Sequence, residues 1–251
     1  MPSSVKAGVR FNQGIVPTIA CFNNATVPLG VDFDKLIAAL QKYIDTCVAP
    51  AWGTAAKLVK TTGFQTGAWA MVFLDDADQK GALAYHDLTP EHLPVAKVFV
   101  KSILAEKVLV SVSASHELVE MLVDPAMNIY TKGPDVAATY AYESADPVEE
   151  SYFPINQIQM SDFLYPAYFE AFRGAKTVQF DHMNLLTKAF QILAGGYQIV
   201  MKEGKETQVF GSKDKERRFR KEDRRGHRSE TRRAGQLQVA DIKTIKKYFR
   251  S

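Results

Sequence analysis

The sequence contains few cysteines: only Cys21 and Cys47 occur among its 251 residues. Two thiols are too few for a disulfide framework or for a zinc site built from four cysteines. The sequence therefore excludes a disulfide scaffold, and we expect both thiols to be reduced in an intracellular setting.

Long apolar runs are also missing. No stretch of about 18 or more apolar residues occurs, and the opening segment MPSSVKAGVRFNQG lacks the continuous apolar stretch of a signal peptide. We therefore expect a soluble protein without membrane contact, cytoplasmic in the producing cell. With 46% hydrophobic and 24% charged residues, the chain fits one large globular domain, or one domain with an appended segment.

An excess of acidic over basic residues is missing at the C-terminal end, where basic residues predominate. Residues 202–251 contain 17 Lys/Arg and 8 Asp/Glu, whereas residues 1–201 contain 14 and 20. This shift in charge marks a boundary. We predict a globular domain over residues 1–211 and a basic C-terminal arm over residues 212–251.

The first part of the arm contains few apolar side chains. Residues 213–233 contain 11 Lys/Arg and 5 Asp/Glu with almost no aliphatic side chains, so they cannot form a core of their own. They form either a solvated helix or disordered arm, or a contact with phosphates, nucleic acid or an acidic protein surface. Beyond them, a short amphipathic helix is predicted that needs an apolar surface on the body or a neighbouring subunit; its apolar positions are Val239, Ile242, Ile245 and Phe249.

Within the body, the pattern predicts an α+β fold with a mixed or mainly antiparallel sheet. A helix is expected from an N-cap at Asp34, and a second, mostly apolar helix over residues 105–123 that ends before Pro125. The extended segments are expected at residues 17–23, 26–33, 67–76, 81–88 and 94–104, with 67–76 and 81–88 forming a hairpin around ADQKG and the end of 94–104 able to enter a helix. A long excursion over 130–168 follows, and YQIVM and TQVFG form a closing hairpin after Gly195 and Gly196.

The apolar second helix contains an unexpected group of charged residues, HELVE at 116–120. Residues four apart lie on one helix face, so His116 and Glu120 lie one turn apart and both could contact one ion, while Glu117 points about a quarter turn away. The spacing is similar to the zinc-peptidase motif HExxH, in which the intervening glutamate is the general base. Here Glu120 replaces the second histidine, which gives a harder site that suits zinc but also manganese, iron or calcium.

Such a site needs a further ligand. Asp124 lies about 12 Å from His116 along a helix axis, too far to share an ion. Glu143 and Asp146, in the segment AYESADPVEE, are better donors if the chain returns to the helix.

The order of the motifs HELVEMLVDPAMNIY, YAYESADPVEESY, MSDFLYPAYFE and LAGGYQIV resembles a zincin-like family of phages and bacteria with an H-E-x-x-E-x-x-x-D-P core. HELVE followed by an acidic segment also resembles the plant EXORDIUM-like proteins, in which HELxE is followed by a segment of the type E-I-G-D. The resemblance covers roughly residues 80–211. It departs at YESAD, where the family tends to have glycine before the aspartate.

The resemblance implies a zincin-like core, with His116 and Glu120 as ligands, Glu117 as the base, and Glu143 or Asp146 as further acidic ligands of a divalent metal, zinc first. It also implies that an edge strand, here ALAYHDL, binds an extended peptide substrate. The family points to a phage-encoded, virion-associated metallopeptidase. The alternative is a catalytically silent structural component of a phage particle, whose basic arm makes assembly contacts with other subunits.

Plainer interpretations remain open for several residues. His116 and Glu120 could form a simple i,i+4 pair on a partly exposed helix face. His86 could be a ligand, a substrate contact or an edge-strand histidine bonded to Asp87 or the backbone, and we favour the last. Turn formation is favoured over a calcium loop for Asp75, Asp76 and Asp78, and packing over a binding groove for the aromatic residues between 140 and 172.

Overall fold

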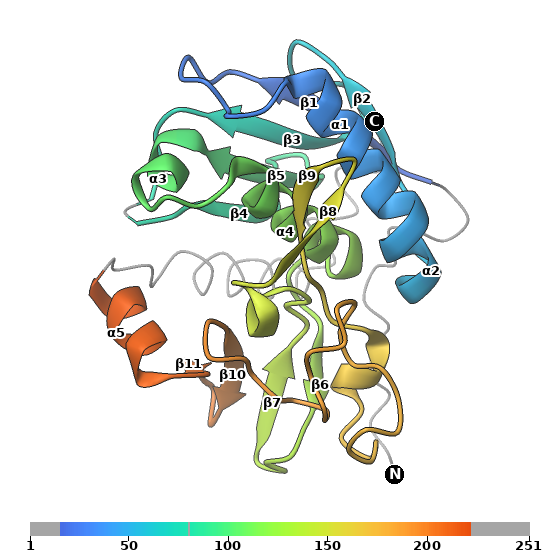
Figure 1. Cartoon of the computed structure of the whole chain (residues 1–251), viewed down its shortest axis with the longest axis vertical. Coiled ribbons are helices and arrows are strands. Elements are labelled where there is room, and N and C mark those ends of the chain that lie inside the picture. Colours follow the sequence, from blue (N-terminus) through green and yellow to red (C-terminus); the bar gives the residue numbers. More distant parts are fainter. Residues whose placement is uncertain (1–15, 80, 222–251) are drawn as a thin grey trace.

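The computed structural model describes residues 16–79 and 81–221 and shows a mixed α+β fold, as the sequence predicts (Figure 1). The main sheet has the strand order β2-β1-β3-β5-β4. Its neighbouring strands run parallel except for β4, which pairs antiparallel with β5 at one edge. The strands are β1 (Thr18–Asn23), β2 (Lys57–Lys60), β3 (Trp69–Leu74), β4 (Ala84–Leu88) and β5 (Pro94–Phe99).

The predicted hairpin between residues 67–76 and 81–88 is wrong, because β5 lies between β3 and β4. Both β3 and β5 are buried along almost their whole length. Strands that are buried on both faces take central positions in a sheet. The more polar strand AYHDL is therefore left at the edge. Segment 26–33 is also not a strand, since it forms the loop that leads into the first helix.

The first helix, α1 (Phe33–Tyr43), continues through the π-turn η1 (Ile44–Val48) into α2 (Ala49–Trp52). Its N-cap is Asp32, whose carboxylate accepts a hydrogen bond from Lys35 N at 3.0 Å. The prediction of Asp34 as the cap is wrong, because Asp34 lies inside the first turn and pairs with Lys60 Nζ at 2.6 Å.

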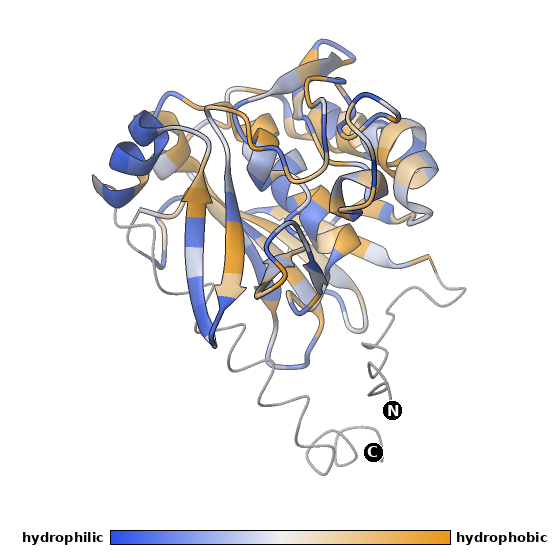
Figure 2. Cartoon of the chain, turned by 90° about the horizontal axis from the view of Figure 1, so that it is seen from below, coloured by the Kyte–Doolittle hydropathy of each residue, from blue (hydrophilic) through white to orange (hydrophobic). Residues whose placement is uncertain are grey.

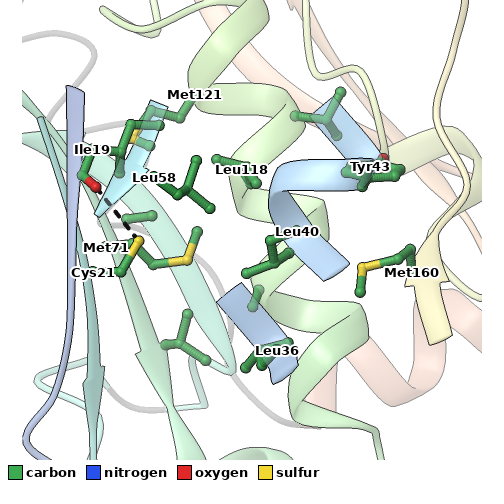
Figure 3. Close-up of a cluster of buried hydrophobic side chains, with 14 of the residues drawn as sticks. Ile19, Cys21, Leu36, Leu40, Tyr43, Leu58, Met71, Leu118, Met121 and Met160 are labelled. Atoms are coloured by element: carbon green, nitrogen blue, oxygen red, sulfur yellow. Dashed lines mark hydrogen bonds between the residues drawn. The ribbon is translucent and has the colours of Figure 1, made fainter. Parts of the chain in front are cut away.

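The main core lies between one face of the sheet and two helices, α1 and α4 (Val110–Val123) (Figure 3). Figure 3 shows side chains of the sheet, α1 and α4 packed together in one cluster. Burial of this apolar surface is the main stabilising contribution. The labelled residues are Leu36, Leu40 and Tyr43 of α1, Ile19, Cys21, Leu58 and Met71 of the sheet, Leu118 and Met121 of α4, and Met160.

The helix predicted over residues 105–123 starts later, at Val110, and a separate short helix precedes it, as the sequence allowed for the end of segment 94–104. α3 (Val100–Ala105) continues from β5 and ends before Lys107, whose φ of 57° is left-handed and interrupts the helix. α4 then runs to the residue before Asp124, as Pro125 requires. Every residue of α4 from Val110 to Leu122 is buried. Even so, no helix in the described ranges is both long and apolar enough to span a bilayer.

The second part of the molecule is an antiparallel sheet in the order β11-β10-β7-β6, in the lower half of Figure 1. The predicted closing hairpin is confirmed, with Val200 of β10 opposite Thr207 of β11. The remaining elements are β6 (Tyr130–Lys132), β7 (Ala138–Ala141), η2 (Asp146–Val148), β8 (Tyr152–Ile155), β9 (Ile158–Ser161), η3 (Pro166–Phe169), β10 (Tyr197–Lys202) and β11 (Lys205–Phe210). Aromatic packing in the excursion is confirmed for Phe163, Tyr168 and Phe169, all buried.

The last described element, α5 (Lys213–Lys221), is the beginning of the predicted basic arm. It is strongly hydrophilic (Figure 2), yet Phe219 is buried against the rings of Tyr197 and Phe210, each at a centroid distance of 5.1 Å. Lys215 Nζ lies 2.6 Å from Glu149 Oε2. The arm therefore begins as a helix packed on the body, while its remainder and the terminal helix predicted around 239–249 lie outside the described residues.

Candidate metal centre

The HELVE segment is buried inside the molecule. His116 is 8% exposed, Glu117 3% and Glu120 0%. The i,i+4 contact is present, since His116 Nε2 lies 3.5 Å from Glu120 Oε1. The interpretation as a partly exposed helix face is wrong, because α4 is surrounded by the sheet, α1 and β9.

The segment after β7 returns to α4, as the sequence argument required. Ala145 N donates to Glu120 Oε1 at 3.2 Å, and Leu164 N donates to Ser144 O at 2.7 Å, so backbone bonds hold both sides of this turn. Asp146 Oδ1 lies 3.2 Å from His116 Nε2. Both predicted downstream donors, Glu143 and Asp146, are buried at this centre.

His86 of β4 also belongs to the centre. Its side chain is buried, with Nδ1 at 3.3 Å from Glu117 Oε2 and 3.8 Å from Glu120 Oε2. The favoured interpretation of a backbone contact is confirmed, because Nε2 lies 3.3 Å from Asp124 O. It is incomplete, because Nδ1 faces the carboxylates of α4. The alternation of AYHDL places His86 on the same sheet face as Ala84 and Leu88. The sequence does not reveal that this face meets α4, because that depends on the position of β4 as the antiparallel edge strand.

The candidate ligand atoms form two overlapping groups that could hold a metal ion. One group is His116, Glu117 and Glu120, and the other is His86, Glu120 and Glu143; within each, the atoms lie within 4.8 Å of one another. Two ligands at zinc-like bond lengths of about 2.0–2.2 Å can be at most about 4.4 Å apart. A small adjustment of side chains therefore fits an ion, and imidazole with carboxylate donors suits zinc or manganese.

The electrostatics of the centre favour a cation. Burial lowers the pKa of His116, but the carboxylates of Glu120, Asp146 and Glu117 outweigh it and hold the pKa well above its usual value. These carboxylates stabilise positive charge at the imidazole. A histidine must be neutral to bind a metal, and the metal then supplies the positive charge that the proton would otherwise supply.

Other carboxylates have structural roles. Asp124 accepts from Asn128 N at 3.0 Å and Ile129 N at 2.9 Å, which turns the chain after α4. Asp75 accepts from Thr26 N, Thr26 Oγ1 and Val27 N and so holds the loop before α1. The predicted turn is present, since Asp75, Asp76 and Asp78 lie in bends after β3.

A cleft of about 300 Å³ opens onto the centre. Of the five predicted site residues, His116 and Glu117 line this cleft, whereas Glu120, Glu143 and Asp146 lie behind them. The remaining lining is mixed and comes from both parts of the molecule. Its apolar side chains include Leu83 and Ala84 at the start of β4, Leu109 and Val112 around the start of α4, and Ile199 and Phe219. Its charged side chains are Glu106, Lys107, Glu149, Glu150, Lys215 and Arg218.

Comparisons of the chain with protein-family models, with curated proteins and with solved structures gave no match. The function therefore has to be argued from the geometry of the centre and its cleft.

Proposed function

We propose that the chain is a zincin-like, metal-dependent hydrolase that cleaves peptides, with a zinc ion bound beside His116 and Glu120, where Asp146 Oδ1 lies 3.2 Å from His116 Nε2. We call this the outer position. The observation that carries the proposal is the place of Glu117. It belongs to the His116 group, yet it also lines the cleft, so a carboxylate faces both the ion and a bound substrate.

The arrangement of β4 and α4 supports a zincin-like interpretation. β4 is an antiparallel strand at the edge of an otherwise parallel sheet, and its His86 contacts Glu117 of the motif helix. The cleft is lined by the first two residues of this strand, Ala84 and Tyr85, and by residues 82–83 just before it. An edge strand beside the centre is the arrangement that the sequence resemblance implies for a peptide-binding enzyme.

The edge of β4 is suited to pair with an extended peptide. Phe99 N donates to Leu83 O, which makes this a hydrogen-bonded pair. Because such pairs alternate in an antiparallel ladder, the backbone groups of Ala84 and His86 point away from β5. A peptide that adds there as a further strand would have its main chain fixed beside His116 and Glu117.

The apolar part of the cleft lining favours a bulky apolar side chain in the substrate. Leu109 is 47% exposed and Tyr152 is 49% exposed, and both line the cleft. Burial of such side chains against a ligand stabilises the complex by about 25 cal/mol per Å² of apolar surface. We therefore expect peptides with a large aliphatic or aromatic residue to be preferred.

In the reaction, Glu117 is the general base. When bound, a divalent ion supplies a Lewis acid that polarises the scissile carbonyl and lowers the pKa of water. Glu117 accepts a proton from the attacking water as the water oxygen bonds to the carbonyl carbon. The same carboxyl then donates this proton to the amide nitrogen as the C–N bond breaks, which leaves a carboxylate and an amine.

The variant Glu117→Gln tests this role. The full chain, loaded with zinc, is incubated with a fluorescence-quenched peptide library that contains bulky apolar residues, and the products are identified by mass spectrometry. We expect wild-type cleavage, retention of zinc in Glu117→Gln, and a loss of rate of about 10²–10⁴-fold, the usual contribution of a general base. Glu91→Gln, in the exposed turn before β5, is the control and should cleave normally.

A variant Glu117→Gln that cleaves as fast as the wild type would contradict the assignment of the base. Zinc bound in stoichiometric amount by an inert wild-type chain would instead favour the alternative of a structural component that has kept the fold and the ion.

A further inference from the structure

We propose that the chain binds a second divalent cation at an inner position formed by His86, Glu120 and Glu143, which rests on the metal centre of the proposed function. Their ligand atoms lie within 4.8 Å of one another, and the three side chains are at most 3% exposed. Two of the three, His86 and Glu143, are not in the group that contains His116. The centre therefore offers two positions that share one residue.

The orientation of His86 allows it to bind a metal ion through Nδ1. A carbonyl oxygen can only accept, so the contact of His86 Nε2 with Asp124 O at 3.3 Å is a hydrogen bond only when Nε2 carries the proton. In that tautomer the lone pair is on Nδ1, which faces the carboxylates of Glu117 and Glu120, whereas the other tautomer would donate Nδ1–H to Glu117 Oε2 at 3.3 Å. Metal-binding histidines characteristically donate their other N–H to a backbone carbonyl or carboxylate in this way.

Glu120 is placed to bridge the two positions. Its Oε1 lies 3.5 Å from His116 Nε2, and its Oε2 lies 3.8 Å from His86 Nδ1. The bond from Ala145 N to Oε1 fixes the rotation of the carboxylate. One carboxylate with an oxygen toward each histidine is the arrangement of two-metal sites, whose ions are about 3.5–4 Å apart.

The charges of the centre match two divalent ions. Four carboxylates are buried here, those of Glu117, Glu120, Glu143 and Asp146. Burial of ionised carboxylates is costly unless opposite charge is close by. Two divalent cations would balance four ionised carboxylates and leave both histidines neutral, as metal ligation requires.

The two positions differ in their access to the cleft. His116 and Glu117 line the cleft, whereas the inner ligands His86 and Glu143 do not. The inner ion would therefore lie behind the reacting groups. Its place is between β4, α4 and the segment before η2, where it would fix Glu120 and the edge strand relative to each other.

Metal stoichiometry tests the proposal. The full chain is freed of metal with a chelator, dialysed against Zn²⁺ or Mn²⁺, and analysed by elemental mass spectrometry. We expect two ions per wild-type chain, one in His86→Ala and one in His116→Ala. Glu143→Gln, which keeps the side-chain shape, provides a second variant should His86→Ala fail to fold. His92→Asn, in the turn before β5, is the control and should bind two ions.

A spectroscopic measurement gives an independent readout. In the Mn²⁺-loaded wild type, the proximity of the ions should produce an exchange-coupled electron paramagnetic resonance spectrum, and Glu143→Gln should give that of an isolated Mn²⁺. One ion per wild-type chain, lost in His116→Ala and kept in His86→Ala, would overturn the inner position and leave the proposed function intact. A wild-type chain that binds no ion would overturn both.

Discussion

Asp162 is a buried carboxyl outside the metal centre, just after β9. Its Oδ1 accepts hydrogen bonds from Phe163 N at 2.8 Å and Met183 N at 3.0 Å. Burial raises the pKa of Asp162 to about 8, and the neighbouring Asp181 carboxylate adds to the rise. The folded protein therefore holds a proton here that the unfolded chain, with a value of 3.8, releases in neutral solution.

This proton makes stability depend on pH. The folded-state pKa of Asp162 lies above the unfolded one, so the stabilisation is complete below pH of about 4 and is lost as the pH rises through about 8. The slope in this window approaches about 1.4 kcal/mol per pH unit. In Asp162→Asn the amide keeps the accepting oxygen and offers N–H donors toward Asp181, so we expect this variant to lose roughly 2 kcal/mol less than the wild type between pH 6 and pH 8.

Urea unfolding of the two proteins at several pH values measures the difference. Asp45→Asn, an exposed aspartate in the π-turn, is the control and should follow the wild type. Parallel pH profiles for Asp162→Asn and the wild type would show that Asp162 is ionised in the folded protein and would contradict the prediction.

At the scale of single residues, spacing predicted the members of the centre that lie on one helix. His116, Glu117 and Glu120 follow from helical geometry alone. Glu143 and Asp146 could be predicted on the condition that the chain returns to α4. The hydrogen bond from Ala145 N to Glu120 shows that it does. His86 was not favoured as a ligand, because its strand reaches α4 only through the order of the sheet.

At the scale of elements, strong periodicity was a good guide and connectivity was not. The apolar helix with its stop at Pro125 and the hairpin of β10 with β11 are confirmed, since both are local patterns. The supposed hairpin of β3 with β4 is not, because which strand becomes central depends on the burial of β5, which is a property of the whole sheet. The residues of the turn between β3 and β4 cannot show that β5 takes the central position instead.

Gly196 packs directly against the backbone of η2, the turn that carries Asp146. A Cβ there would lie 2.2 Å from Pro147 O and 2.8 Å from Asp146 O, both backbone atoms of η2. Since backbone cannot move aside as a flexible side chain can, we expect Gly196→Ala to lower the free energy of unfolding by about 1–3 kcal/mol. It should also weaken metal binding, because η2 carries Asp146.

Urea unfolding and metal titration by calorimetry measure the two effects. Gly63→Ala is a matched control, because a Cβ at Gly63 meets nothing within 4 Å and the residue has no left-handed φ. Wild-type stability together with wild-type affinity in Gly196→Ala would show that the close packing of residues 193–196 on η2 is not needed.

At the scale of the molecule, the centre lies where the five-stranded sheet and α4, which share the main core, meet the turn η2 beside the second sheet. β4 belongs to the five-stranded sheet, α4 to the main core, and η2 lies beside β10 of the second sheet. Each contributes a candidate ligand: His86, Glu120 and Asp146 respectively. An ion at this junction therefore stabilises the arrangement of the whole fold, since it binds the folded chain and not the unfolded one.

Removal of metal should consequently lower the thermal stability of the whole molecule in one transition. At a free-ion concentration 100 to 1,000 times the dissociation constant, a bound ion stabilises by about 2.7–4.1 kcal/mol. For a chain of this length each kcal/mol shifts Tm by about 2–4 °C, so we expect a loss of roughly 5–15 °C in chelator, reversed by added Zn²⁺. Scanning calorimetry of the full chain measures this. Glu120→Gln, which weakens the shared ligand, should lose most of the shift, and an unchanged wild-type Tm in chelator would contradict a metal-stabilised fold.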